Sequence, residues 1–311
     1  MDRELLQSKF LGSLLGTAVG DALGVPFEGW RQSELAEVRA VADELRVLRY
    51  TDDTHMMIGV AHSLVAKRGF DGEHMAQTFV RNYEQEPWRG YGPGPPHVFR
   101  MIREGEAWDK ASAKIYPGGS YGNGAAMRIA PVGVLYHDDP VKLREVAHRQ
   151  SQITHAHELG KEGAALQAYA IALATNLDPV SPFDGAGFVK RLADFVQPGI
   201  YRQKLAKIGW LKGEPNRARV VANLGNGIEA FSSVPTAIYS FVWHACSFEE
   251  AVLYAISLGG DADTIGAMTG AICGAYLGVE SIPRAWVDKL ENGEYIQVLA
   301  EELWKLKVQG Q

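Results

Sequence analysis

Two short acidic segments carry the residues whose types and spacing could do chemistry. The first is Thr51-Asp52-Asp53, and the second is Asp261-Ala262-Asp263-Thr264. Neighbouring carboxylates repel one another and are expensive to bury without a partner. Mg²⁺ binds carboxylate and hydroxyl oxygens, so a hard divalent cation would relieve that repulsion. The pattern predicts a cation site to which both segments contribute, with room for two ions in one cage.

Each segment also has a simpler interpretation, because threonine and aspartate are good N-caps and both segments precede an apolar helical run. That interpretation does not explain why two carboxylates stand beside a threonine in both places. Zinc is a weaker hypothesis, since it favours histidine and thiolate ligands. His155 and His157 have the H-x-H spacing of amidohydrolase barrels, but they lie mid-chain among helical stretches. We interpret His55, His97 and His244 as surface residues or satisfied core residues.

A glycine-rich stretch over 118–128, with the sequence GGSYGNGAAMR, is the third feature. Its glycines expose backbone N–H groups, and Ser120 and Asn123 add side-chain hydrogen bonds, so the stretch could hold a diphosphate. Tyr116 and Tyr121 flank it and could enclose a planar base. A ligand-free glycine turn covered by tyrosines fits the same residues, and the sequence leaves both interpretations open.

Two glycine ladders predict how helices position these segments. Within each ladder the glycines are four residues apart, which puts them on one face of a helix: Gly12, Gly16, Gly20 and Gly24 in the first, Gly266, Gly270, Gly274 and Gly278 in the second. A glycine inside a helix costs about 1 kcal/mol relative to alanine, and the compensating gain is a close approach of two helix axes. We therefore expect the two helices to pack together or share a neighbour, which brings Glu28 close to Asp261 and Asp263.

Much of the remaining sequence is typical of helices. Apolar residues recur at helical spacing over 5–15 and 58–65, and further helices are expected over 141–152, 161–177, 235–245, 248–258 and 264–277. Alternation of apolar and polar residues is weak and confined to 44–50, the one candidate strand. Long loops are expected at 84–96, 116–123 and 181–187. The sequence favours an all-α fold.

Composition narrows the class of protein. The chain has 311 residues, 46% of them apolar, and length alone gives a prior of two domains. Its 31 basic and 37 acidic residues give a net charge of −6, which argues against non-specific nucleic-acid binding. Two cysteines are too few for a disulfide scaffold. The N-terminus lacks the apolar run of a signal peptide. The uncharged run 264–279 is too short to span a bilayer. We expect a cytoplasmic protein without nucleic-acid or membrane partners; a monomer is favoured, although the sequence leaves the oligomeric state open.

Together the segments resemble the ADP-ribosylglycohydrolase family, and they occur in family order along nearly the whole chain. The matching pieces are Gly20-Asp21-Ala22-Leu23-Gly24 with Glu28, Tyr50-Thr51-Asp52-Asp53-Thr54, Ser120-Tyr121-Gly122-Asn123-Gly124-Ala125-Ala126-Met127-Arg128, Thr154-His155, Pro235-Thr236-Ala237, and Gly259-Gly260-Asp261-Ala262-Asp263-Thr264. The resemblance implies one all-α domain over 1–311, a compact orthogonal helix bundle with a binuclear metal cleft. It replaces the two-domain prior.

The resemblance also implies a role for each site residue. Two Mg²⁺ ions, or Mn²⁺ in their place, would be held by Thr51, Asp52 and Asp53 on one side and by Asp261, Asp263 and Thr264 on the other, with Asp263 bridging. Glu28 would lie on a mobile flap, and Glu28 and Asp261 are the candidates for catalytic proton transfer and water activation. Substrate would be bound by Tyr116, Gly119, Ser120, Tyr121, Gly122, Asn123 and His155. Ala262 replaces a threonine often found in the family, with little expected effect.

The reaction that the resemblance implies is hydrolysis at the anomeric carbon of ADP-ribose attached to protein, with release of ADP-ribose. The glycine-rich loop and Glu28 look like the branch that cleaves O-linked ADP-ribose, from serine, from polymer chains or from O-acetyl-ADP-ribose. The arginine-specific branch, which cleaves an N-glycosidic bond, is an alternative that shares most of these motifs. A non-catalytic ADP-ribose-binding protein is disfavoured because every expected acid is present, and a two-metal phosphoesterase is a third alternative.

Overall fold

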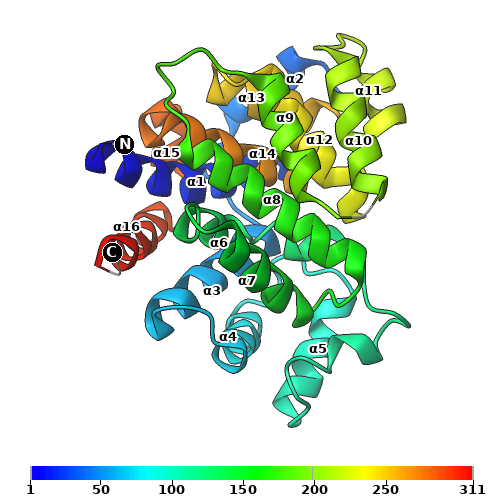
Figure 1. The fold of residues 1–311 in the computed structure, drawn as a ribbon, viewed down its shortest axis with the longest axis vertical. Coiled ribbons are helices and arrows are strands. Elements are labelled where there is room, and N and C mark those ends of the chain that lie inside the picture. Colours follow the sequence, from blue (N-terminus) through cyan, green and yellow to red (C-terminus); the bar gives the residue numbers. More distant parts are fainter. Residues whose placement is uncertain (1, 198, 310–311) are drawn as a thin grey trace.

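Helix α1, Arg3–Gly24, and helix α14, Ala262–Leu277, lie side by side through the middle of the molecule (Figure 1). The structure is a computed structural model that describes residues 2–197 and 199–309. Glycines of the two helices face each other so closely that a Cβ on either partner would overlap the other's backbone, in the pairs Gly12 with Gly274, Gly16 with Gly270, and Gly20 with Gly266. The predicted contact between the ladders is confirmed, and no layer of large side chains separates the two axes.

This contact continues to the ends of both helices that carry the acids. Gly24, the last residue of α1, lies against the backbone of Asp263. A 3-10 turn, η1 (Val25–Phe27), follows and leads directly to Glu28. Gly278 is an exception to the ladder, because it follows the last residue of α14 with a φ of 87° and caps the helix. The helix pair therefore brings Glu28 to the N-terminal end of α14.

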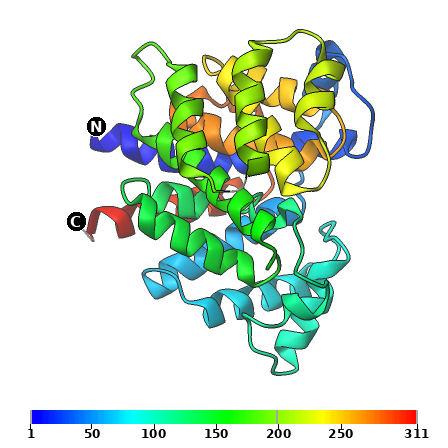
Figure 2. The same ribbon diagram turned by 45° about the vertical axis from the view of Figure 1, so that its right-hand side comes forward.

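The other helices pack on two sides of this pair (Figures 1 and 2). One side holds α3 (Asp52–Lys67), α4 (Gly72–Gln85), α5 (Gly94–Arg103), α6 (Ala130–Leu135) and α7 (Pro140–Gln152). The other holds α2 (Leu35–Glu44), α9 (Gly185–Phe195), α10 (Gly199–Leu211), α11 (Arg217–Leu224), α12 (Ala230–Trp243) and α13 (Phe248–Ser257). The long helix α8 (Glu158–Asn176) runs between the two groups, and α15 (Arg284–Lys289) and α16 (Gly293–Gln309) end the chain. Short 3-10 turns occur at η2 (Ser112–Lys114), η3 (Asn123–Ala125) and η4 (Val279–Ser281).

The described residues contain sixteen α-helices and no strand, so the all-α prediction is confirmed. The candidate strand over 44–50 is wrong. Leu48 makes only an isolated bridge to Leu290, through Leu48 N–H to Lys289 C=O at 2.9 Å and Glu291 N–H to Leu48 C=O at 3.0 Å. A second such bridge joins Gly122 to Glu229. No neighbouring segment continues either ladder, and a short alternating run without a partner does not become a sheet.

The expected helices are present, with shifted ends. Among the helices expected after residue 140, the largest shift is at α12, which was expected to begin at Pro235 and in fact begins at Ala230, with Pro235 inside the helix. Proline is better tolerated at the first turn of a helix than inside it, which is why the sequence placed the start there. One buried apolar cluster connects the helices, from Phe10 in α1 to Leu303 in α16.

One segment, Arg3–Phe27, is long and apolar enough to cross a membrane by length and composition alone. In the structure 83% of its apolar window is buried against other helices. Its apolar character is therefore explained by its place at the centre of the helix bundle.

Candidate active site

Both acidic segments lie at helix N-termini, and the two termini face one cleft. Thr51 is the N-cap of α3, and its hydroxyl accepts a hydrogen bond from Asp53 N–H at 3.3 Å. Asp261 is the N-cap residue of α14. Asp261 makes no side-chain cap hydrogen bond, so the N-cap interpretation is confirmed for Thr51 only. Both helix starts nevertheless place short oxygen-bearing side chains at the same cleft.

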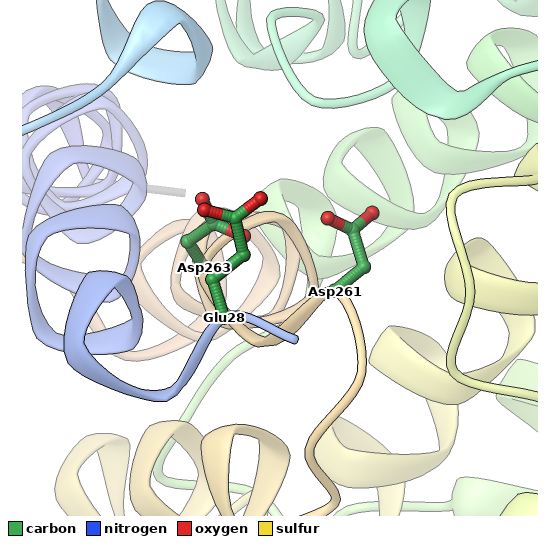
Figure 3. A group of neighbouring side chains, drawn as sticks. All are labelled: Glu28, Asp261 and Asp263. Atoms are coloured by element: carbon green, nitrogen blue, oxygen red, sulfur yellow. The ribbon is translucent and has the colours of Figure 1, made fainter. Parts of the chain in front are cut away.

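Three carboxylates converge where η1 meets α14. Glu28, Asp261 and Asp263 each offer an oxygen, and these oxygens lie within 4.8 Å of one another (Figure 3). Asp261 and Asp263 are buried, whereas Glu28 is exposed. Such a set of hard oxygen donors matches the ligand preference of Mg²⁺ and Mn²⁺.

The acids of α3 belong to the same electrostatic cluster. Burial, followed by the nearby Asp21 charge, raises the pKa of Asp52 to about 8, and Asp261 and Glu28 add to the effect. Burial and neighbouring carboxylates also raise the pKa values of Asp53 and Asp263 well above the ordinary range. Asp53 Oδ2 is buried and has no hydrogen-bond partner among the described residues. An unpartnered buried carboxylate oxygen amid like charges fits a cation ligand, so these residues suit a divalent metal.

A cleft of about 250 Å³ lies over the acids. Its lining includes twelve of the fourteen predicted site residues: Glu28, Thr51, Asp52, Asp53, Tyr116, Ser120, Gly122, Asn123, His155, Asp261, Asp263 and Thr264. The structure therefore brings into one cavity residues from six separate stretches of the sequence. Segment 90–95, which leads into the first turn of α5, adds Gly90, Gly92, Pro93, Gly94 and Pro95 to the wall.

Gly119 and Tyr121 lie outside the cleft lining. Gly119 has a φ of 86°, and a Cβ there would overlap the backbone between Ala156 and His157, so this glycine lets the loop pack against the start of α8. Tyr121 is about half exposed and packs edge-on against His157, with ring centroids 5.5 Å apart. Their roles in substrate binding stay predictions.

The glycine-rich loop is fastened to the acids by Asn123. Its Nδ2 donates to Asp261 and, at 3.0 Å, to Ser233 Oγ. The hydrogen bond from Asn123 favours the charged form of Asp261, although burial raises the pKa of this carboxyl overall. Gly124 allows the loop to lie against His155, since a Cβ there would overlap the imidazole.

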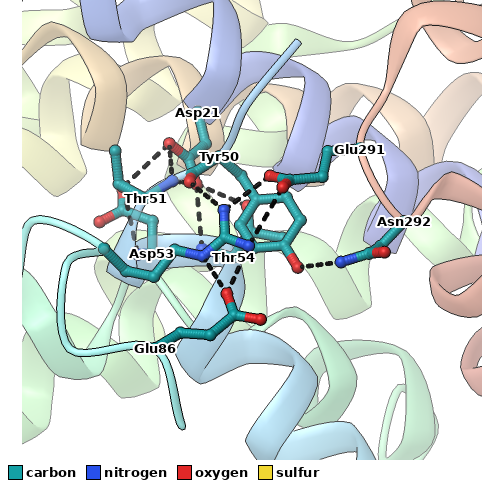
Figure 4. A network of polar contacts seen from close by, with 9 residues as sticks. Asp21, Tyr50, Thr51, Asp53, Thr54, Glu86, Glu291 and Asn292 are labelled. Carbon is teal, nitrogen blue, oxygen red and sulfur yellow. Dashed lines mark hydrogen bonds and ion pairs between the residues drawn. The ribbon is translucent and has the colours of Figure 1, made fainter. Parts of the chain in front are cut away.

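Asp21 is a structural site residue to which the sequence analysis gave no role. It is fully buried in α1, and its carboxylate accepts hydrogen bonds from the backbone N–H groups and the hydroxyls of both Thr51 and Thr54 (Figure 4). Burial raises its pKa to about 6, and the four donors oppose that effect. A single aspartate in the apolar C-terminal half of α1 is the sequence signal that could have identified it. Asp21 fixes the start of α3 and hence the position of Asp53.

Arg89 holds the chain that leads into the same acidic segment. Its guanidinium forms ion pairs with Glu86 and, at 2.6 Å, with Glu291, and it donates to the Tyr50 carbonyl at 3.1 Å. It also lies 4.3 Å from the Tyr50 ring centroid, and the Tyr50 hydroxyl accepts from Asn292. No local sequence pattern predicts this network, because Arg89 and Glu291 are 202 positions apart.

The histidines have separate roles. His155 lines the cleft, and burial, followed by the Arg128 charge, lowers its pKa to about 3. His157 is the N-cap of α8, where its Nδ1 accepts from Leu159 N–H at 3.1 Å. The all-α fold overturns the amidohydrolase-barrel alternative, which requires this H-x-H pair on a strand. His55 is buried with its Nδ1 2.9 Å from the Tyr91 hydroxyl, as expected of a satisfied core residue.

Comparison with known proteins agrees with this geometry. The family model described as ADP-ribosylglycohydrolase matches residues 2–311. The chain is 36% identical to the ADP-ribosylhydrolase ARH3 of Mus musculus, over 96% of this chain and 92% of the mouse protein. It is 27% identical to the ADP-ribosyl-[dinitrogen reductase] glycohydrolase of Rhodospirillum rubrum, over 92% and 91% of the two chains.

A solved structure gives the same result for the fold. A chain of an ADP-ribosylglycohydrolase-related protein complex superimposes with a TM-score of 0.78 at 26% identity, covering 98% of this chain and 99% of the other. The family match, the sequence identity and the shared fold extend over almost the whole length of the chain. The chain belongs to the ADP-ribosylglycohydrolase family and is a glycosidase of that type.

Proposed function

We propose that this enzyme hydrolyses the glycosidic bond at the anomeric carbon of ADP-ribose attached through oxygen to protein, with serine linkages as the preferred substrate. The observation that carries the proposal is the convergence of Glu28, Asp261 and Asp263 in a cleft shared with Asp52 and Asp53. The resemblance of this chain to the mouse ADP-ribosylhydrolase ARH3 supports ADP-ribosylhydrolase activity of that type. Polymer chains and O-acetyl-ADP-ribose are further substrates of the same chemistry.

The proposed cofactor is a pair of Mg²⁺ ions, which Mn²⁺ could replace. The residues that would hold them are Thr51, Asp52, Asp53, Asp261, Asp263 and Thr264, with Asp263 shared. When bound, the ions would supply positive charge that fixes the distal ribose and offsets the acid cluster. The unpartnered Asp53 Oδ2 supports this proposal.

The chain's own residues would handle the protons. Glu28 is exposed at the mouth of the cluster, where it can reach both solvent and a bound sugar. Asp261 is held by the Asn123 amide, which fixes the direction of its carboxylate. Cleavage at an anomeric carbon develops positive charge on the sugar, which nearby carboxylates stabilise. Glu28 and Asp261 are therefore the proposed residues for proton transfer and water activation.

The rest of the cleft would bind the ADP part of the substrate. Backbone N–H groups of the glycine-rich loop, with Ser120 and Asn123, suit the diphosphate and the distal ribose. Tyr116 lines the cleft and, with Tyr121, is proposed to hold the adenine.

We further propose that residues 1–311 act as one domain. The protein would be a cytoplasmic monomer whose partners are ADP-ribosylated proteins.

The test compares two peptides that differ only in whether ADP-ribose is linked to serine or to arginine. Each is incubated with the enzyme in Mg²⁺ and in EDTA, and free ADP-ribose is measured by mass spectrometry. We expect release from the serine peptide in Mg²⁺ only, and no release by Asp263→Asn. Faster release from the arginine peptide would favour the N-glycosidic alternative. Binding of ADP-ribose without release from either peptide would identify a non-catalytic binding protein.

A further inference from the structure

Arg128 lies beneath the cleft and is completely buried. Its Nε donates to Gln150 Oε1 at 2.8 Å, and its Nη2 donates to the Gln150 carbonyl at 2.9 Å. Its Nη1 donates to Thr154 Oγ1 at 2.9 Å, and its guanidinium lies 4.7 Å from the Phe79 ring centroid. This charged group does not line the cleft, so its influence on a ligand must pass through the residues that it contacts.

The hydrogen bond to Thr154 leads directly to His155. Thr154 Oγ1 is 2.8 Å from His155 Nδ1. An arginine can only donate, so Thr154 Oγ1 accepts from Arg128 and its single hydrogen is free for His155 Nδ1. In the opposite arrangement Nδ1–H would donate to Thr154, and the Thr154 hydroxyl hydrogen would lack an acceptor among the described residues. Thr154 is only 5% exposed, and leaving a buried donor unpaired is unfavourable.

This chain of donors decides which ring nitrogen of His155 carries the proton. If Nδ1 accepts from Thr154, the neutral imidazole has its hydrogen on Nε2. Nε2 lies beside Gly122 and Gly124, where a Cβ would stand 3.3 Å and 2.9 Å away. Among the described residues, no group forms a hydrogen bond with Nε2, and His155 lines the cleft. The Nε2–H group is therefore available to a ligand.

We propose that Arg128 and Thr154 are positioning residues that lock His155 as the Nε2–H tautomer, a neutral hydrogen-bond donor directed at an anionic or hydroxyl oxygen of the ADP-ribose substrate. The proposal that the ligand is ADP-ribose rests on the proposed function; the tautomer does not. Burial, followed by the Arg128 charge, lowers the pKa of His155 and so opposes protonation of the imidazole.

The first measurement is the tautomer in the intact wild-type protein. Histidine labelled with ¹⁵N is observed by two-bond ¹H–¹⁵N correlation NMR, and the His155 signals are assigned by their loss in His155→Gln. We expect a single neutral Nε2–H tautomer between pH 5.5 and pH 8. An Nδ1–H tautomer, or an imidazolium at pH 7, would overturn the proposal without the need for any variant.

The second measurement uses a matched pair at Thr154. Thr154→Val keeps the shape but removes the hydroxyl, so we expect mixed tautomers and about tenfold weaker ADP-ribose binding in Mg²⁺ by calorimetry. Thr154→Ser keeps the hydroxyl and should restore both the single tautomer and the binding. If Thr154→Val has mixed tautomers but binds ADP-ribose with unchanged affinity, the proposed hydrogen bond from His155 Nε2–H to the ligand is refuted. A locked tautomer in a wild-type protein that binds no ADP-ribose would support the lock and refute the proposed function.

Discussion

Asp21 in α1 and Thr54 in α3 are joined by two hydrogen bonds: Asp21 Oδ2 accepts from Thr54 N–H at 3.0 Å and from Thr54 Oγ1 at 2.6 Å. The helix whose glycines pack against α14 therefore also holds the N-terminus of α3. Because one helix fixes both acidic segments, the distance between them depends on α1. Stability and metal binding should accordingly be coupled in this protein.

The first prediction concerns Asp21→Asn. The amide replaces one acceptor oxygen by an NH₂ group that faces donors of Thr51 and Thr54, so at least one hydrogen bond is lost. We expect the free energy of unfolding to fall by about 2 kcal/mol and Mg²⁺ affinity to fall about 10- to 100-fold. Urea denaturation and calorimetry measure the two effects. Asp194→Asn, at an exposed ion pair on α9, is the control, and equal Mg²⁺ affinity in both variants would contradict the role of Asp21.

The second prediction concerns Gly270→Ala in α14. A methyl group there would overlap the Gly16 backbone, and neither helix can move without shifting the acids. We expect a loss of stability of about 3 kcal/mol or more, together with weaker Mg²⁺ binding. Gly209→Ala is the matched control, since Gly209 is also inside a helix but a Cβ there meets nothing within 4 Å. The free energy of unfolding of Gly209→Ala should rise by about 0.5–1 kcal/mol. Similar melting temperatures for the two variants would contradict the close-packing interpretation.

The contact between α1 and α14 and the placement of the acids could be predicted from the sequence, because both depend on local sequence patterns. A glycine every four residues marks one helix face, and a paired acid beside a threonine marks a helix start, so both patterns are local. The positions of Glu28, Asp53 and Asp263 around one cleft followed from these patterns. Arg89 with Glu291 did not, because a single ion pair between distant segments has no periodic signal. Tyr121 was placed near a base on its sequence position alone, but packing against His157 decides the direction of its ring.

The third prediction concerns Arg89→Met. Arg89 is 8% exposed and neutralises Glu86 and Glu291, so its loss leaves two carboxylates without their partner. We expect a loss of about 3 kcal/mol in stability and a smaller loss of Mg²⁺ affinity, because the Tyr50 carbonyl next to Thr51 is released. The control is Arg103→Met, whose exposed ion pair with Glu84 should be worth less than about 1 kcal/mol. Equal urea midpoints for the two variants would argue against the Arg89 network.

The fourth prediction is a pH dependence of the metal-free protein. The pKa of Asp52 is raised to about 8 and those of Asp53 and Asp263 are also raised, whereas an unfolded aspartate titrates near 3.9. Between about pH 4 and pH 8 these carboxyls therefore bind more protons in the folded state than in the unfolded chain, so their contribution to the free energy of unfolding falls as pH rises. The lowered pKa values of buried histidines such as His155 act in the opposite direction below about pH 6.5.

Urea denaturation in EDTA at pH 5.5 and pH 8 checks this effect, for which we expect a difference of more than about 2 kcal/mol. Mg²⁺ should stabilise the protein most at pH 8, where its ligands give up fewer protons on binding. Asp263→Asn in EDTA should show a smaller pH dependence, because one raised carboxyl is gone. A pH dependence of Asp263→Asn equal to that of the wild-type protein would show that the acids are not held as the structure indicates.

The fifth prediction separates binding from turnover at Glu28. Two backbone hydrogen bonds join the residues beside it to the loop before α14: Gly29 N–H donates to Gly260 C=O at 2.8 Å, and Gly260 N–H donates to Trp30 C=O at 2.9 Å. Glu28→Gln keeps the length of the side chain and this backbone contact but removes the proton-accepting carboxylate. We expect ADP-ribose affinity within about threefold of wild type and turnover lower by about 100-fold or more, the scale of a lost general acid–base group.

Single-turnover release of ADP-ribose from the serine-linked peptide measures the chemical step, and calorimetry with ADP-ribose measures binding. Glu37→Gln, an exposed glutamate on α2, controls for the loss of one negative charge near the N-terminal third of the chain. A Glu28→Gln enzyme that loses binding and turnover in equal proportion would mean that the segment only shapes the cleft. In that case Asp261, which accepts a hydrogen bond from Asn123, would be the remaining candidate for activating water. The third carboxylate of the cluster, Asp263, is already proposed as the ligand shared by both ions.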